Sequence, residues 1–121
     1  MNRQVGKITK KIIQILGLNY NEEKPIFIGD ANIKHIKNEH PEDFKKYFFK
    51  IEEIIRSPTY LARNEKKKSI EFIKKYNLDE REYVLVAVRV SNNNVHFVRT
   101  MYIMADEKVK KYFKNNYFYK F

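Results

Sequence analysis

Apolar and polar positions in the first part of the chain predict helices with one strand among them. Residues 7–18 place isoleucines and a leucine on one side of an amphipathic helix that Gly17 ends. The polar stretch 19–24 is a linker. The apolar run 25–28, which Gly29 stops, indicates a strand.

Two helices are predicted next, on either side of Pro41. Asp30 can cap the first helix, which must stop by His40 because proline disfavours a helical residue before it. Pro41 suits the first turn of the second helix, which ends at Ser57-Pro58. Its apolar side chains recur at spacings of three and four residues and are Phe44, Tyr47, Phe48, Ile51, Ile54 and Ile55.

Beyond residue 58 the apolar pattern alternates, which predicts adjacent strands. Polar turns at 64–68 and 91–94 separate them, and a short helix starts at Ala105-Asp106. The aromatic tail 117–121 either adds an edge strand or packs down as a plug. The predicted strands are 60–63, 69–75, 83–90 and 95–103.

This order predicts an α+β fold, with N-terminal helices packed on one face of a small antiparallel sheet. A chain of 121 residues fits one domain with one core. We divide it into a basic N-terminal helix (1–20), a core (25–104) and a C-terminal helix with the aromatic tail (105–121).

The charge balance is strongly basic, with 25 Lys and Arg against 15 Asp and Glu and a net charge of +10. Such an excess attracts polyanions, of which nucleic acid is the commonest, ahead of an anionic membrane surface or an acidic inhibitor. An AT-rich genome, which loads surfaces with lysine, is the alternative explanation. The excess lies outside residues 21–60, where seven basic residues meet eight acidic ones.

Several classes of protein are excluded or disfavoured. Without cysteine, the chain has neither disulfides nor thiolate zinc sites. No apolar run approaches the ~20 residues that span a bilayer, so we expect no membrane insertion. The start lacks the apolar region of a secretory signal. We expect the chain to act in the cytoplasm, either as a cytosolic product or after delivery within a secreted or phage-borne protein.

Two of the three histidines, His35 and His40, lie five residues apart at the predicted helix junction. Cleavage of RNA by its own 2′-hydroxyl needs a base and an acid, and histidine can serve as either near neutral pH. The alternatives are two solvated surface residues, or a metal site with Asp30, Glu39 or Asp43. Ligands on a helix share a face when they are four residues apart, so this spacing is poor for a metal.

The strand 95–103 is a second candidate. Alternation places His96, Thr100 and Tyr102 on one face. Their hydroxyl, phenol and imidazole groups can hold phosphate oxygens, and tyrosine can stack a base. Arg99 falls on the apolar face, as a paired structural residue or one that reaches past an edge. A half-exposed strand with polar residues toward water is the alternative.

Basic residues on the neighbouring strands form the third candidate. Lys66, Lys67 and Lys68 occupy a turn and suit general attraction of a nucleic-acid backbone. Lys74 and Arg89 lie inside predicted strands and are better placed to stabilise charge on a phosphate.

Residues 26–104 resemble the phage-associated nucleases grouped with barnase, EndoU, colicin-type tRNases and RelE. The resemblance rests on the order and spacing of four short motifs. These are His35-Ile36 with His40-Pro41, Ile54-Ile55-Arg56-Ser57-Pro58, residues 69–75, and Arg99-Thr100-Met101-Tyr102.

What the resemblance implies is a cofactor-free ribonuclease. Such domains cut RNA, often tRNA, without metal and leave a 2′,3′-cyclic phosphate. They are commonly toxins of phage systems or interbacterial competition, which an acidic immunity protein restrains. Carried over to this chain, the resemblance implies that His35 and His40 act as base and acid, that Lys74 binds phosphate, and that Thr100 and Tyr102 form a hydroxyl pair.

Two other hypotheses remain open at this point. A non-catalytic nucleic-acid-binding or phage-accessory module on the same fold would need the basic surface but neither histidine. A metal-dependent nuclease would use His35, His40 and nearby acids, and a chelator would silence it.

Overall fold

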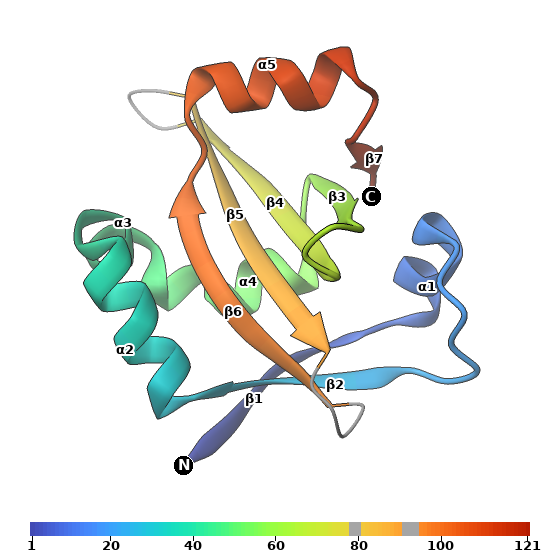
Figure 1. Cartoon of the computed structure of the whole chain (residues 1–121), viewed down its shortest axis with the longest axis horizontal. Coiled ribbons are helices and arrows are strands. Elements are labelled where there is room, and N and C mark those ends of the chain that lie inside the picture. Colours follow the sequence, from blue (N-terminus) through green and yellow to red (C-terminus); the bar gives the residue numbers. More distant parts are fainter. Residues whose placement is uncertain (78–80, 91–94) are drawn as a thin grey trace.

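The computed structural model describes residues 1–77, 81–90 and 95–121, so the predicted turn at 91–94 lies outside the described residues. Helices and strands follow one another along the chain (Figure 1). In order they are β1 (Asn2–Ile8), α1 (Lys10–Leu16), β2 (Lys24–Gly29), α2 (Asp30–Glu39), α3 (Pro41–Tyr47), a 3-10 turn η1 (Phe48–Lys50), α4 (Ile51–Arg56), β3 (Tyr60–Asn64), β4 (Ser69–Asn77), β5 (Arg81–Val90), β6 (His96–Ile103), α5 (Asp106–Lys114) and β7 (Tyr119–Lys120).

The strands form one sheet in the order β1-β2-β6-β5-β4-β3-β7. The α+β class is confirmed, but the prediction of a purely antiparallel sheet is wrong because β2 and β6 run parallel. Parallel neighbours need a long connection. Here that connection contains α2–α4 and β3–β5, so the antiparallel pair β1–β2 joins strands that come much later in the chain.

The predicted helix over 7–18 is a strand followed by a shorter helix. The register of β1 on β2 shifts between Gln4 and Gly6, which places the buried Val5 and Ile8 three residues apart. That spacing looks helical in the sequence, although it arises from a strand irregularity. Thr9 then caps α1, since its hydroxyl accepts the N–H of Ile12 at 3.3 Å.

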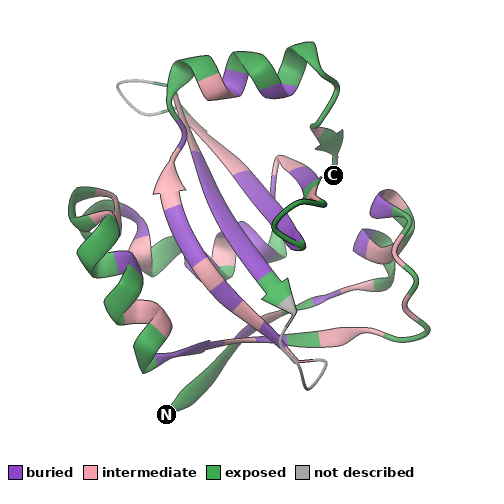
Figure 2. Ribbon diagram, viewed as in Figure 1, coloured by how far each residue is buried: buried purple, intermediate pink, exposed green. Residues whose placement is uncertain are grey.

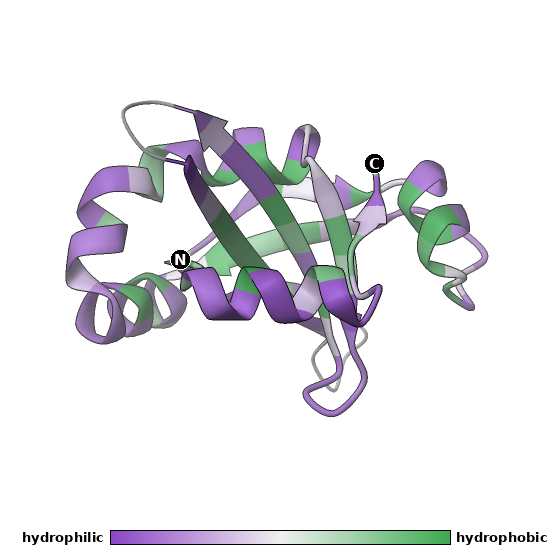
Figure 3. Cartoon of the chain, turned by 90° about the horizontal axis from the view of Figure 1, so that it is seen from above, coloured by the Kyte–Doolittle hydropathy of each residue, from purple (hydrophilic) through white to green (hydrophobic). Residues whose placement is uncertain are grey.

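Helices lie on both faces of the sheet, not only on one. The larger core joins α1–α4 to one face and includes Ile12, Ile36 and Ile54. On the opposite face a smaller core joins the sheet to α5 through Val109 and Tyr112. Buried residues concentrate along β4–β6, the strands on whose two faces the cores form (Figure 2). Figure 3 shows α5 as an amphipathic helix apart from the other helices.

The aromatic tail combines both predicted alternatives. β7 pairs with β3 as an edge strand, with Leu61 opposite Tyr119. Just before it, the Phe118 ring stacks on Tyr60 with the centroids 4.6 Å apart. Among the described residues, no helix is both long enough and apolar enough to cross a membrane.

Candidate functional site

Strand β6 carries a β-bulge at Arg99, where its register on β5 shifts by one residue. A bulge of this kind reverses which residues face each side. His96 and Val98 therefore lie on the side of the larger core, whereas Thr100 and Tyr102 face α5. The prediction that His96 shares a face with the two hydroxyl residues is wrong.

His40 lies at the junction of α2 and α3 and contacts Tyr102. The two ring centroids are 5.1 Å apart, with 31° between the ring planes. Asp43, in the first turn of α3, fixes this arrangement because its carboxylate accepts the backbone N–H of Ile103 at 3.0 Å. The start of α3 is thereby attached to β6 next to Tyr102.

Helix α5 adds a cation to this pair. The Nζ of Lys108 donates a hydrogen bond to the hydroxyl of Tyr102 and lies 4.8 Å from the centroid of its ring. The same ammonium is 5.9 Å from the ring centroid of Tyr112. Cations in such positions are attracted by the electron-rich ring face. Imidazole, phenol and ammonium groups thus meet around Tyr102, whose side chain is partly exposed.

Glu71, a buried residue of β4, holds α5 against the sheet through a hydrogen bond. The hydroxyl of Tyr112 donates to Oε1 of Glu71 at 2.7 Å, and both residues are buried. Burial, reinforced by the adjacent carboxylate, raises the pKa of Tyr112, which keeps its hydroxyl protonated as a donor. Glu71 and Thr100 flank Ala87 on the two neighbouring strands. The small Ala87 side chain leaves room for these polar groups beneath the helix.

A cleft of about 800 Å³ opens between α5 and the β3–β4 hairpin. Lys108 and Tyr112 form part of its wall. The other charged side chains around it are Arg63, Lys66 and Lys111 against Glu65 and Glu107. The cleft is therefore positive, and it leads to the ammonium that contacts Tyr102.

The structure does not bring His35 or Lys74 to Tyr102. His35 is exposed on α2, and five residues of helix turn it about 140° away from His40. Lys74 pairs with Val84 on the side of the larger core, and its Nζ donates to the carbonyl of Ser57 at 2.6 Å.

The predicted nucleic-acid contacts are spread over the surface. Arg89 is exposed near the end of β5, and Arg99 is half-buried at the bulge. Lys66, Lys67 and Lys68 are exposed in the β3–β4 turn, where Lys66 lines the positive cleft.

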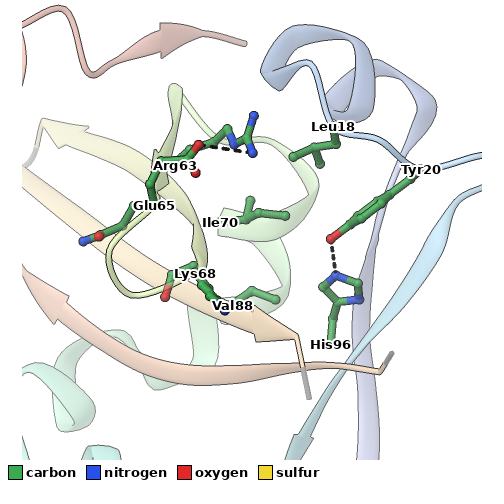
Figure 4. Close-up of a pocket in the computed structure, with 10 residues that line it drawn as sticks. Leu18, Tyr20, Arg63, Glu65, Lys68, Ile70, Val88 and His96 are labelled. Carbon is green, nitrogen blue, oxygen red and sulfur yellow. Dashed lines mark hydrogen bonds and ion pairs between the residues drawn. The ribbon is translucent and has the colours of Figure 1, made fainter. Parts of the chain in front are cut away.

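His96 belongs to a separate pocket of about 320 Å³ near the start of β6 (Figure 4). Its Nε2 lies 2.9 Å from the hydroxyl of Tyr20. Burial, and to a smaller extent the charge of Lys24, lowers the pKa of His96, so the ring is neutral at pH 7. It is a buried polar residue rather than a surface contact.

A family model described as phage-Barnase-EndoU-ColicinE5/D-RelE like nuclease3 matches residues 3–111. The chain belongs to this nuclease family. Membership implies a nucleic-acid substrate for the nuclease. The match is wider than residues 26–104, since it includes most of β1, all of α1 and the part of α5 that carries Lys108. Comparisons with curated proteins and with solved structures find no match.

The sequence did not point to three polar residues where α5 of the nuclease packs on the sheet, namely Lys108, Tyr112 and Glu71. Lys108 and Tyr112 are four residues apart on the predicted helix, which places them on one side. Glu71 is a lone acid within the apolar run 69–73. A charge in such a run was the available signal, because buried carboxylates need partners. Within the described part of the chain, no cluster of three or more His, Asp or Glu residues is arranged to hold a metal ion.

Proposed function

We propose that the nuclease is a metal-independent endoribonuclease that cleaves RNA through its own 2′-hydroxyl. The observation that carries this proposal is the meeting of His40, Tyr102 and Lys108 at one partly exposed point. Together they offer a base, a proton donor and a positive charge. These are the groups that transesterification of a phosphodiester requires.

In the proposed step, His40 takes the proton of the 2′-hydroxyl while the 2′-oxygen bonds to phosphorus. Lys108 stabilises the negative charge that develops on the phosphate oxygens. The bond from phosphorus to the 5′-oxygen breaks, and Tyr102 gives that oxygen its hydroxyl proton. Lys108 returns a proton to Tyr102, and exchange with solvent restores Lys108 and His40. The products are a 2′,3′-cyclic phosphate and a free 5′-hydroxyl.

The roles of the remaining candidates follow from their positions. The positive cleft beside α5 holds the RNA backbone, with Arg63, Lys66 and Lys111 as phosphate contacts. Thr100 is buried on the face of Tyr102 and supports the strand. We assign no catalytic role to His35 or Lys74. A tRNA is the first substrate to test, and an acidic immunity protein would fit the same cleft in the cytoplasm.

The test is cleavage of labelled tRNA by the purified chain in EDTA, with products identified by mass spectrometry. We expect His40→Ala to lower the cleavage rate about 10²–10⁴-fold, the usual contribution of a general base. His35→Ala is the matched control, because it removes an exposed imidazole from α2, five residues before His40. Its cleavage rate should equal that of the parent.

Two further arms test the mechanism. Tyr102→Phe keeps the ring that contacts His40 but removes the hydroxyl, and it should also cleave slowly. A substrate with 2′-deoxyribose at the cleaved position should stay intact. If His40→Ala cuts as fast as the parent, the assignment is wrong. RNA binding without any cleavage by the parent would favour a binding module.

A further inference from the structure

The Tyr20–His96 pocket is separate from the proposed catalytic point. It lies between the loop after α1, the β3–β4 hairpin and the start of β6 (Figure 4). Its volume of about 320 Å³ is at the lower end for small-ligand sites, which suits a single compact group. Tyr20 gives it an aromatic wall, and Leu18, Ile70 and Val88 give it an apolar lining.

The hydrogen bond between Tyr20 and His96 leaves one donor available. Nδ1 of His96 is buried, and no partner for it is found among the described residues. A buried N–H without an acceptor is rarer than a bare acceptor, so we place the ring hydrogen on Nε2. Nε2 then donates to the Tyr20 oxygen, and the Tyr20 hydroxyl hydrogen is free for a ligand. Burial raises the pKa of this hydroxyl, which keeps it protonated.

The rim of the pocket is positive. Arg63 donates to the carbonyl of Leu16 at 3.0 Å and pairs with Glu65 at 3.2 Å, which occupies two of its five N–H groups at most. Lys68, from the turn of the same β3–β4 hairpin, also lines the pocket and is exposed. Glu65 offsets one of the two cations, so the rim keeps a net positive charge that attracts an anionic group.

We propose that this pocket binds one nucleotide of the RNA substrate, away from the cleaved bond. The base packs against Leu18, Ile70 and Val88 and accepts a hydrogen bond from the Tyr20 hydroxyl, while Arg63 and Lys68 contact the phosphate. This inference rests on the proposed function, since it takes RNA as the ligand.

The Tyr20–His96 pocket and the proposed catalytic point lie close enough for one RNA strand to contact both. His96 and Tyr102 are six residues apart on β6, a distance of about 20 Å at about 3.3 Å per residue. Arg63 and Glu65 line both this pocket and the cleft beside α5. The RNA backbone can therefore pass from this pocket to the cleft over the residues that line both.

The experiment measures binding of single nucleotides to the unmodified chain by calorimetry, because a nucleoside 3′-monophosphate has no phosphodiester bond to cleave. The probes are the four nucleoside 3′-monophosphates and inorganic phosphate. At least one nucleotide should saturate the chain, more tightly than phosphate alone. Tyr20→Phe, which keeps the ring, and Lys68→Gln should each weaken that binding about tenfold, as loss of one hydrogen bond to a charged or polar group implies.

Lys67→Gln is the matched control, because it removes the same charge from the same turn at a residue that does not line the pocket. It should bind as the parent does. The proposal is overturned if no nucleotide saturates, if phosphate binds equally well, or if Tyr20→Phe binds normally. The outcome is independent of catalysis: nucleotide binding with no cleavage by the unmodified chain refutes only the ribonuclease proposal.

Discussion

The bond between Tyr112 and Glu71 gives a prediction for stability that the structure makes quantitative. Tyr112→Phe removes one hydroxyl and keeps the ring that packs α5 against the sheet. The lost hydrogen bond is 2.7 Å long, and both partners are more than nine-tenths buried. Glu71 would then be a buried carboxylate without that donor.

A hydrogen bond to a charged group contributes about 1.5–3 kcal/mol, and a buried site lies near the upper end of that range. Phenylalanine fills the same space, so no cavity adds to the loss. We expect the free energy of unfolding to fall by about 2–3 kcal/mol. For a domain of this size that is a fall in melting temperature of roughly 10 °C.

Urea unfolding followed by circular dichroism measures this change. Tyr117→Phe is the control, since Tyr117 is on the surface and its ring contacts Tyr112. Its stability should stay within about 0.5 kcal/mol of the parent. Glu71→Met combined with Tyr112→Phe should regain most of the loss, because replacing both partners leaves nothing unpaired. A Tyr112→Phe chain as stable as the Tyr117→Phe control would refute the reasoning.

Three shorter predictions concern the site and pH. Asp43→Ala removes the acceptor of the Ile103 N–H, so cleavage should slow while RNA binding persists; unchanged cleavage would show that Asp43 does not position His40. Cleavage should be equal in EDTA and in Mg²⁺, and loss in EDTA would contradict the mechanism. Because burial lowers the pKa of His96, the unfolded chain takes up its proton first. Stability should therefore fall as pH drops below about 6.5, by at most about 1.4 kcal/mol per pH unit. Urea unfolding at pH 7.5 and 5.5 checks this, and His96→Gln should flatten the dependence.

Much of the fold could be predicted because local patterns determine it. The helix start at Asp30, the break at Pro41 and the alternation in β4 and β5 all depend on neighbouring residues. Irregularities in strands could not be predicted. The bulge at Arg99 and the register shift near Gly6 move side chains to another face without any change in composition.

The candidate site was only partly visible in the sequence. His40 and Tyr102 stood out by residue type, and the structure brings their rings together. Lys108 and Glu71 did not, since no local pattern shows their contacts. Lys108 contacts Tyr102 on the strand just before its helix, and Glu71 contacts Tyr112, which lies 41 residues away in the chain. Lys74 was predicted to share a site with Thr100 and Tyr102, but the register of β4 places it on the side of the larger core.

The three groups at the proposed catalytic point are synthesised far apart in time. His40 belongs to the first half of the chain, whereas Tyr102 and Lys108 come near its end. Contacts between residues so distant in sequence form late in folding. A nascent chain therefore carries the imidazole of His40 before Tyr102 and Lys108 have been added, and the proposed catalytic point cannot form until both residues have been synthesised.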